Sequence, residues 1–430
     1  MIISKSKEMM QRSFEKTLYR FMEVPRPVFD GHFGIYIHVP FCLSKCSFCP
    51  FYKELFSDKL KRQYLDAILK EIDDTDIQGE AKWVYFGGGT PNTLALEDIY
   101  KIVERIRGKV QINSMGIELL PALLDDEYLK GLKATGFTKI SIGVESFSDE
   151  VEKTGRKIAT YDHVRGIIEL AKSLGLWVNV DMMVGLPNQD ANTFRYDIKT
   201  ISTILPNQIT IYPFMVIRGL KAVPGIPPQE QFKLIEEADE LLGRFAYSRR
   251  GVWTFTLGDD IYDSSRDELI EDYAGFGPSA FSTYGDWKVV NPELGIYVKN
   301  FGNGKRMGFV ATKTKASDEW RKFARMIYDL KVDNSCNLPP YIEIFTWLLK
   351  LTGYIKHGIL TGKGRIFAHE ITKAVVESLP FPVQNPGCVE NYDEYIYYKN
   401  GCVASDNTVY AVRSATLNTP KTISSQSKLA

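Results

Sequence analysis

Several classes of protein are excluded by what this 430-residue chain lacks. It contains no run of about 18 apolar residues, the length that a membrane-spanning helix needs. Its start, MIISKSKEMMQRSF, has charged residues among the apolar ones, whereas a secretory signal carries an uninterrupted apolar run. Basic and acidic residues balance at 53 each, so net charge indicates neither a nucleic acid nor another polyanion as partner. We therefore expect a cytoplasmic protein without an integral membrane segment, whose cysteines are reduced thiols.

The sequence contains no internal repeat and no low-complexity segment. From residue 33, short β-rich runs alternate with longer amphipathic stretches. Short β-rich runs predict strands at Gly34–His38, Trp83–Phe86, Gly116–Leu119, Lys139–Gly143, Val178–Val184 and Ile209–Phe214. Amphipathic stretches between them predict helices, for example at Lys59–Ile72, Glu97–Ile106, Asp162–Leu174 and Asn192–Ile204. Strand–helix units in series predict an α/β fold, a parallel sheet with helices outside that curls into a partial or full barrel. In such a fold ligands bind at the carboxyl ends of the strands.

The alternation stops after Pro213, which indicates additional parts of the chain. We predict an N-terminal helical segment over 1–32, the barrel over 33–225, a barrel-covering extension over 226–310, a small and mostly helical second domain over 311–415, and a disordered tail over 416–430. Residues 229–246 are predicted as one helix, and GYIKHGILTGKGRIF in the second domain is typical of a helix–turn–hairpin. The final Lys-Leu-Ala resembles a scar from an expression vector.

Cysteine is scarce, and half of it is concentrated in one place. Three of six cysteines, Cys42, Cys46 and Cys49, lie within eight positions in VPFCLSKCSFCPFY. Structural zinc sites usually close with a fourth ligand, and none lies nearby. Three thiolates on one short loop suit a cubane iron–sulfur cluster with one iron left open, and we favour this over zinc or buried structural cysteines. The other cysteines, Cys336, Cys388 and Cys402, are too widely spaced to predict a second cluster.

A glycine-rich turn, VYFGGGTPN, follows the second predicted strand at Val84–Asn92. Its three glycines allow positive φ and a close approach of the backbone. Such a turn can offer backbone N–H groups to an anion, or it can be only a turn. It lacks the Lys-Ser/Thr pair of a phosphate-binding P-loop, so nucleotide triphosphate binding of that type is excluded.

C-x₃-C-x₂-C after the first strand of such a barrel resembles the radical S-adenosylmethionine (SAM) superfamily. YIHVPFC, FGGGTPN, KISIGVESFSDEVEKTGR, VNVDMMVGLP and GFGPSAFS occur in the order of its oxygen-independent coproporphyrinogen III oxidase-like (HemN-like) subfamily, and LTGKGRIF resembles that subfamily's C-terminal domain. The resemblance implies a partial (β/α)₆ barrel and a [4Fe–4S] cluster held by Cys42, Cys46 and Cys49. It also implies SAM on the open iron, an electron donor such as flavodoxin or ferredoxin, and a 5′-deoxyadenosyl radical.

The same resemblance implies roles for individual residues. It places Tyr36 near the first SAM, Phe48 near the adenine of that SAM, and Gly88, Gly89 and Thr90 on its methionyl part. Glu118 would contact a second SAM. Glu145, Arg156 and Asp181 would bind the first SAM or lie between the two molecules, and Met183 would pack on an adenine. These residues can also have purely structural roles: Glu118 as an exposed carboxylate, Arg156 as a solvated side chain, and Tyr36 and Phe48 as core aromatic residues. Asp181 lies in an apolar strand and therefore needs a partner.

The segment GFGPSAFSTYGDW is predicted to cover the barrel opening. We expect Gly277 and Phe281 near the second SAM, and Tyr284 and Trp287 on the side of a flat, unsaturated small-molecule substrate. Glu118 and Tyr284 are the predicted catalytic residues. The bland alternative for the aromatic residues is the core of a lid.

Two departures from the subfamily guide the choice of reaction. Phe51 stands where the coproporphyrinogen decarboxylases carry an additional Cys, and VVNPELGIYV keeps Asn291 and Tyr297 of the haem-chaperone signature H-N-x-x-Y-W but lacks its His and Trp. The leading hypothesis is therefore a class C radical SAM methyltransferase, which uses two SAM molecules to methylate, or transfer a methylene group to, an sp² carbon. The alternatives are haem- or porphyrin-directed chemistry, of the anaerobilin synthase or decarboxylase type, and a haem chaperone.

Overall fold

The computed structural model describes residues 17–152, 160–216, 222–259, 272–332, 338–378, 382–383 and 386–400. Arg156, Cys336, Cys402 and the predicted tail over 416–430 lie outside these residues, as do residues 1–16 of the predicted N-terminal helical segment. No helix in the described part is long and apolar enough to cross a membrane.

The predicted parallel strands form the centre of a single large sheet. They are β3 (His32–Val39), β7 (Glu80–Gly88), β9 (Met115–Leu119), β10 (Lys139–Glu145), β11 (Trp177–Val184) and β12 (Gln208–Pro213), paired in parallel in that order. Short β8 (Gln111–Ile112) pairs with the start of β7. The α/β barrel-type arrangement predicted from the alternation is confirmed.

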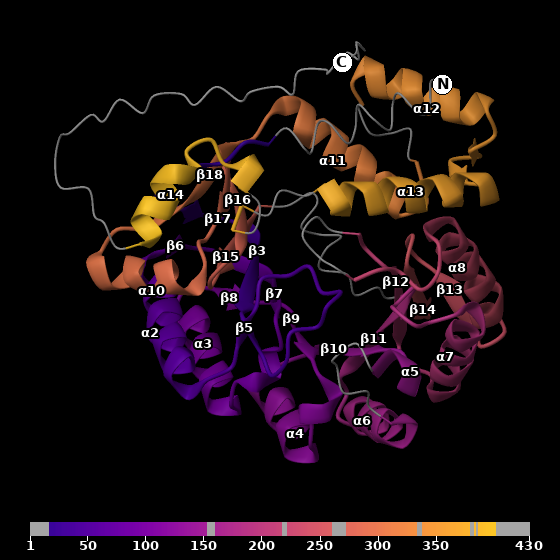
Figure 1. The fold of residues 1–430 in the computed structure, drawn as a ribbon, viewed down its shortest axis with the longest axis horizontal. Helices are drawn as coiled ribbons and strands as arrows, with labels where there is room; N and C mark the ends of the chain where they lie inside the picture. The colour runs from indigo at the N-terminus through magenta and orange to yellow at the C-terminus, as the bar shows by residue number, and fades with distance from the viewer. Residues whose placement is uncertain are drawn as a thin grey trace, which may run out of the picture.

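Helices connect these strands on the outside of the sheet, as the crossover rule for parallel strands requires. They are α2 (Asp58–Asp74), α3 (Leu96–Arg107), α4 (Asp126–Thr135), α5 (Asp149–Glu152), α6 (Tyr161–Ser173) and α7 (Ala191–Ile204); α8 (Pro228–Gly243) follows the last of the six strands. The side chains of Ser57, Asp125 and Asp190 accept a hydrogen bond from the first turn of α2, α4 and α7, which fixes where these helices begin. In Figure 1 the helices form an arc around the strands.

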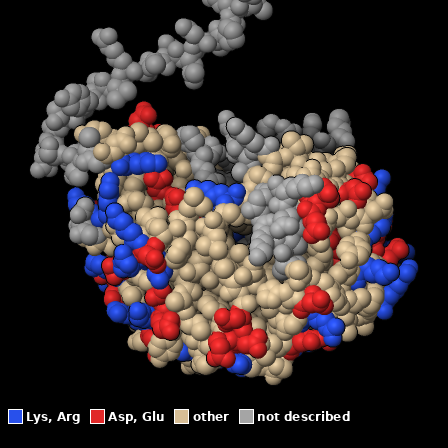
Figure 2. All heavy atoms as spheres, turned by 60° about the horizontal axis from the view of Figure 1, so that its bottom comes forward, with Lys and Arg blue, Asp and Glu red and all other residues tan. Residues whose placement is uncertain are grey.

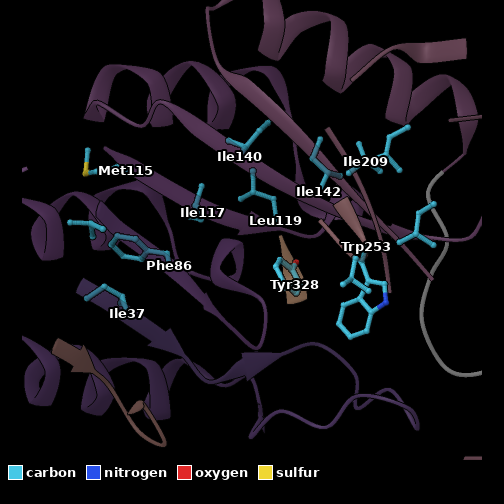
Figure 3. Close-up of a cluster of buried hydrophobic side chains, with 14 of the residues drawn as sticks. Ile37, Phe86, Met115, Ile117, Leu119, Ile140, Ile142, Ile209, Trp253 and Tyr328 are labelled. Carbon is cyan, nitrogen blue, oxygen red and sulfur yellow. The ribbon is translucent and has the colours of Figure 1, made fainter. Parts of the chain in front are cut away.

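The two faces of the sheet differ sharply in polarity. Apolar side chains at alternate positions, including Ile37, Phe86, Ile117, Ile140 and Ile209, are fully buried against the outer helices (Figure 3). Burying each such side chain stabilises the fold by about 1.5–3 kcal/mol. The intervening residues point to the inner face of the curved sheet and are mostly polar, small or aromatic. The outer face therefore holds the barrel together and leaves the inner face for a binding site.

Additional strands extend the sheet at both edges. On the β12 side are β14 (Thr254–Leu257) and β13 (Tyr247–Arg249); on the β3 side follow β15 (Tyr273–Phe276), β16 (Phe281–Tyr284), β17 (Trp287–Val290), β18 (Met307–Thr312) and β1 (Arg20–Glu23). The extension predicted over 226–310 is thus divided between the two edges of the sheet. Small two-stranded pairings are formed by β2 (Val28–Phe29) with β6 (Asp76–Ile77), and by β4 (Phe41–Cys42) with β5 (Glu54–Leu55).

The predicted helix over 1–32 needs a correction in its described part. Residues 20–23 form a strand that pairs antiparallel with β18, and residues 28–29 form another. Phe21 enters an apolar cluster with Phe309 and Tyr395, so long-range packing decides the local structure. Sequence periodicity could not show this, because the partners lie almost 300 residues away or more.

Helices from the last part of the chain lie across the gap between the two edges in Figure 1. They are α11 (Lys315–Tyr328), α12 (Pro340–Leu351) and α13 (Gly362–Ser378), while α10 (Leu294–Asn303) and α14 (Tyr392–Lys399) lie on the β3 side. A hairpin of β19 (Ile355–Lys356) and β20 (Ile359–Leu360) precedes α13, as GYIKHGILTGKGRIF indicates. Figure 2 shows acidic and basic side chains interspersed on one face, in keeping with the charge balance.

Candidate radical SAM site

The cysteine loop lies at the carboxyl end of β3, where the fold predicts a ligand site. Cys42 ends β4, and the N–H groups of Glu54 and Phe56 donate to the carbonyls of Pro40 and Cys42 at 2.7 and 3.0 Å, which closes the base of the loop. Cys46 and Cys49 are half-buried, Cys42 is buried, and none of the three forms a disulfide. The structure therefore places the three predicted ligands on one short loop fixed at both ends.

The surroundings of the loop fit a cubane cluster better than a single ion. Within the described residues, no three Cys, His, Asp or Glu side chains are grouped closely enough to hold one metal ion. A cubane takes each thiolate on a different iron, so its ligands lie farther apart than those of one ion. Cys46 and Cys49 pack against an apolar cluster that contains Phe48, Leu186 and Phe214. This side of the loop is shielded from water, which suits a redox centre.

The glycine turn after β7 packs directly against the end of β3. Gly88 has φ +107°, and a methyl group there would lie 2.6 Å from the His38 ring. At Gly89 a methyl group would lie 2.7 Å from the Phe41 carbonyl oxygen. Both positions therefore require glycine, since any side chain would separate the turn from the strand that leads into the cysteine loop.

The turn does not use its N–H groups in the way the sequence suggested. The N–H groups of Gly89 and Thr90 donate to the carbonyls of Val39 and Phe41 at 2.8 and 2.7 Å. The Thr90 hydroxyl lies 3.5 Å from Sγ of Cys42. These two N–H groups are occupied in the structure, so neither is available to bind an anion.

A group of aromatic and acidic side chains lines the inner face beside the glycine turn. The rings of Tyr36 and Tyr85 stack with centroids 6.4 Å apart and an interplanar angle of 21°. The Tyr85 hydroxyl donates to Oε1 of Glu118 at 3.0 Å. A methyl group at Gly87 would lie 3.1 Å from the Glu118 carboxylate and from the Tyr36 ring. The structure thus brings the predicted residues Tyr36 and Glu118 together and adds Tyr85, which the alternation in VYFGG could have indicated.

His38 is the polar residue that joins the glycine turn to the strand end. Its Nε2 lies 3.1 Å from the Tyr52 carbonyl oxygen, so Nε2 carries the proton, and Nδ1 accepts from the Tyr36 hydroxyl at 3.3 Å. Burial lowers the pKa of His38 to about 4, outweighing the hydrogen bond to Tyr52. The ring is therefore neutral at physiological pH. His38 was not a predicted site residue, although it stands in YIHVPFC.

Asp181 lies in a polar network that spans three strands. Ser141 donates to its Oδ2 at 2.6 Å and Asn179 donates to its Oδ1 at 2.8 Å. Thr210 in turn donates to the Asn179 side-chain carbonyl at 2.9 Å. The need for a partner that the sequence indicated is met within the protein. The half-exposed carboxylate is held in one orientation on the inner face.

The end of β10 has an unusual backbone. Glu145 has φ +65°, and the register of β10 against β11 shifts between Gly143 and Glu145. A non-glycine residue in this region is uncommon and suggests a functional constraint. Beyond it, Ser146 and the Phe147 N–H donate to the Asp197 carboxylate at 2.7 and 2.8 Å. Burial raises the pKa of Asp197 to about 6 despite these hydrogen bonds.

Of the remaining predicted residues, Phe48, Met183 and Gly277 lie near the cysteine loop or the strand ends beside it. Phe48 and Met183 lie in the same apolar cluster as Cys46 and Cys49, so both are beside the cysteine loop. Gly277 follows β15 and would place a methyl group 2.4 Å from the His38 carbonyl oxygen, so it also lies at the strand ends. Phe281 is half-buried at the start of β16.

The structure does not bring Tyr284 to this group. Thr283 pairs with Tyr273 and shares the inner face, so the next residue, Tyr284, points to the outer face. Its hydroxyl donates to the Pro25 carbonyl at 2.9 Å and its ring contacts Phe29. Trp287 pairs with Tyr284 and shares that face. The alternative of a packed lid core describes Tyr284 and Trp287 better than the substrate side.

Cys388 is far from the cysteine loop in the fold. It lies in an apolar cluster with Tyr19 and Phe21, and burial raises the pKa of its thiol to about 11. A buried thiol with a raised pKa is protonated at neutral pH and therefore poorly reactive.

Comparison with known proteins agrees with this geometry. Residues 36–201 match the family model described as the radical SAM superfamily, so the chain carries a radical SAM domain. Oxygen-independent coproporphyrinogen III oxidase of Pseudomonas aeruginosa is 25% identical over 308 residues, which cover 64% of this chain and 67% of that protein. Heme chaperone HemW of Buchnera aphidicola subsp. Schizaphis graminum is 26% identical over 380 residues, which cover 80% and 98%.

Two further comparisons complete this assignment. Anaerobilin synthase of Escherichia coli O157:H7 is 30% identical over 192 residues, which cover 43% of each chain. The solved structure of coproporphyrinogen III oxidase (HemN) from Escherichia coli has a TM-score of 0.69 at 22% identity and covers 85% of this chain and 97% of that chain. The chain thus carries a radical SAM domain and is similar over most of its length to oxygen-independent coproporphyrinogen III oxidases and HemW. These names support haem- or porphyrin-directed chemistry, the alternative of the sequence analysis, and give no support to its leading hypothesis of methyl transfer.

Proposed function

We propose that the protein is a radical SAM enzyme that acts on a haem- or porphyrin-type tetrapyrrole. The observation that carries this proposal is the likeness to relatives named for coproporphyrinogen III and heme, which extends over 80% of this chain in the case of HemW. The inner face adds a physical reason. The half-buried ring of Tyr36 stacks on the buried ring of Tyr85 at the inner face, and Glu118 lies beside them as a polar group.

In this proposal Cys42, Cys46 and Cys49 hold the [4Fe–4S] cluster. When bound, the cluster and SAM supply one-electron chemistry that removes hydrogen from carbon. The protein's residues bind and shield. Phe48 and Met183 cover the cluster side with apolar surface, and neutral His38 holds the Tyr36 hydroxyl. Gly88 and Gly89 let the turn that would contact the methionyl part of SAM pack against the end of β3. Asp181, oriented by Ser141 and Asn179, is a hydrogen-bond acceptor for hydroxyl groups of SAM.

The proposal includes a binding site for a second SAM molecule beside the first, without assigning it a role in the reaction. Glu118 and Gly277 would lie near it, and Glu145 and Arg156 would contribute to the first. A SAM titration that saturates at two equivalents supports the second site, and saturation at one equivalent removes it. Formation of S-adenosylhomocysteine would separate chemistry with methyl transfer from decarboxylation, which releases carbon dioxide instead.

Tetrapyrrole binding tests the proposed substrate class. We expect coproporphyrin III or haem, followed by absorption titration of the anaerobically reconstituted protein, to bind in a saturable manner. Tyr85→Ala should weaken binding about tenfold, because one face of the aromatic pair is lost. Tyr341→Ala, on the exposed surface of α12, is the matched control and should bind as the unmodified protein does. Absence of saturable binding, or equal binding by Tyr85→Ala, contradicts the proposal.

A haem chaperone is the second candidate, because HemW is among the relatives. It predicts stoichiometric haem binding with no formation of 5′-deoxyadenosine in the presence of SAM and reductant. The structure gives one reason to prefer the enzyme. Asn291, which matches the Asn of the chaperone signature, and Tyr297 both donate to an internal carboxylate and are thereby occupied.

A further inference from the structure

That internal carboxylate is Glu71, a fully buried acidic residue that the proposed chemistry does not use. It lies in the last turn of α2, the helix that begins just after the cysteine loop. Its oxygens accept four hydrogen bonds: Oε2 from the Gly277 N–H at 2.9 Å and the Tyr297 hydroxyl at 2.5 Å, and Oε1 from Asn291 at 2.9 Å and Arg306 at 2.6 Å. A carboxylate has about four acceptor positions, so all of them are filled.

All four donors come from one segment of the chain. Residues 277–306 follow β15 and include β16, β17 and α10. They are separated from Glu71 by 206 to 235 positions in the sequence. Glu71 therefore fixes the position of this whole segment against the barrel helix that follows the cysteine loop. Burial and the Glu71 charge both raise the pKa of Tyr297, so its hydroxyl stays a donor.

Direct contacts connect Glu71 to the strand ends beside the cysteine loop, where SAM is proposed to bind. The Gly277 that donates to Glu71 approaches the His38 carbonyl so closely that a methyl group would lie 2.4 Å from the oxygen. Tyr64, two turns before Glu71 on α2, donates to the same carbonyl at 3.1 Å. The His38 ring in turn fills the space over Gly88. The ends of β15, β3 and β7 are thus packed in one row, and Glu71 fixes its outer member.

We propose that Glu71 is a positioning residue for SAM binding. It holds Gly277 against His38, and His38 holds the Gly88 turn in the geometry that accepts the methionyl part of SAM. Glu71 contacts neither the cluster nor SAM in this account. The inference depends on the radical SAM domain and not on the tetrapyrrole substrate, so it is tested without substrate.

Glu71→Gln is the sharpest substitution, because it keeps the shape and replaces one acceptor oxygen with a donor. Two donors would then face the new NH₂ group, either Gly277 and Tyr297 or Asn291 and Arg306. The matched control is Glu236→Gln in α8, a half-buried carboxylate bound by arginine and histidine. Its partners lie on the opposite side of the barrel.

The measurements are iron content, melting temperature, the dissociation constant of SAM, and the change that SAM causes in the electron paramagnetic resonance spectrum of the reduced cluster. We expect both variants to lower the melting temperature and to retain their iron. Glu71→Gln should weaken SAM binding about tenfold and diminish the spectral change, whereas Glu236→Gln should leave both unaltered. Should Glu71→Gln fail to fold, Tyr297→Phe removes a single donor and should weaken SAM binding about threefold.

Unaltered SAM affinity and an unaltered spectral change in the folded Glu71 or Tyr297 variant would overturn the proposal. Equal weakening by Glu236→Gln would also overturn it, because the effect would then follow stability alone. Failure of tetrapyrrole binding would leave these results unaffected, so the two proposals are separable.

Discussion

Two carboxylates, one fully buried and one half-buried, form hydrogen-bonded networks on opposite sides of the open barrel. Glu71 on α2 is fully buried and binds one backbone N–H, one hydroxyl, one amide and one arginine. Glu236 on α8 is 19% exposed in its side chain and binds Arg249, Arg365 and His369. Burial alone raises the pKa of Glu236, but His369 and the arginines outweigh it and hold that pKa at about 2.

The partners show what each carboxylate organises. Those of Glu71 lead through Gly277 to His38 and the strand ends beside the cysteine loop. Two of the Glu236 partners, Arg365 and His369, lie on α13, so Glu236 attaches the last helices to α8. His369 accepts from the Trp253 indole at Nδ1, which leaves its Nε2–H to donate to Glu236. One network therefore lies beside the proposed SAM site, and the other attaches α13 to α8.

The largest expected effect tests the site that the Glu71 network supports. Changing Cys42, Cys46 and Cys49 to Ala should abolish cluster binding, so that iron falls from about four per chain to near zero after anaerobic reconstitution. Cys388→Ala, a buried thiol remote from the loop, is the control and should keep its iron. Iron content that the triple variant retains would rule out this ligand set.

Replacing Glu71 and Glu236 by Ala should lower the free energy of unfolding by different amounts. Glu71→Ala leaves Arg306 and three other buried donors without their partner and should lower the free energy of unfolding by about 3–5 kcal/mol. Glu236→Ala should cost less, about 1–3 kcal/mol, because Arg365 is partly exposed and can recruit water, and because Arg249 keeps its ion pair with Asp239. Denaturant titrations of the metal-free proteins measure both. The comparison fails if Glu236→Ala is the more damaging change.

A comparison of two glycines with positive φ, Gly277 and Gly285, tests the contact between Gly277 and His38. Gly277→Ala would force a methyl group against the His38 carbonyl, whereas nothing lies within 4 Å of the position at Gly285, which also has positive φ. Gly285→Ala should cost about 1 kcal/mol from backbone strain alone. Gly277→Ala should cost about 2–3 kcal/mol and also weaken SAM binding. Equal effects on SAM affinity would refute the contact.

The smallest expected effect is on pH dependence. The folded chain keeps His38 neutral down to about pH 4, whereas the unfolded chain binds a proton near pH 6.5. Between these values the unfolded state holds more protons, so the free energy of unfolding should fall by about 1.4 kcal/mol per pH unit as the pH is lowered. Burial lowers the pKa of His369 as well, which adds a contribution of the same sign. His38→Asn should reduce the slope measured by denaturation between pH 6.5 and 5; an unchanged slope would show that His38 titrates normally.

The sequence predicts best what is local. Alternation revealed the strands and their outer helices, and the spacing of Cys42, Cys46 and Cys49 revealed the loop, because each pattern lies within a short stretch. The face of Tyr284 was not predictable, since it depends on the pairing of β16 with β15. Glu71 was also missed. In the sequence it is one charged residue of an amphipathic helix, and its partners lie more than 200 positions away.

The most direct test of the account is product analysis of anaerobic reactions with SAM and a reductant, with and without a tetrapyrrole. The account predicts that coproporphyrinogen III or haem increases the formation of 5′-deoxyadenosine well above the rate without substrate and is itself converted. Conversion should disappear in the Cys42, Cys46, Cys49 triple Ala variant. Formation of 5′-deoxyadenosine that no tetrapyrrole stimulates would contradict the proposed function.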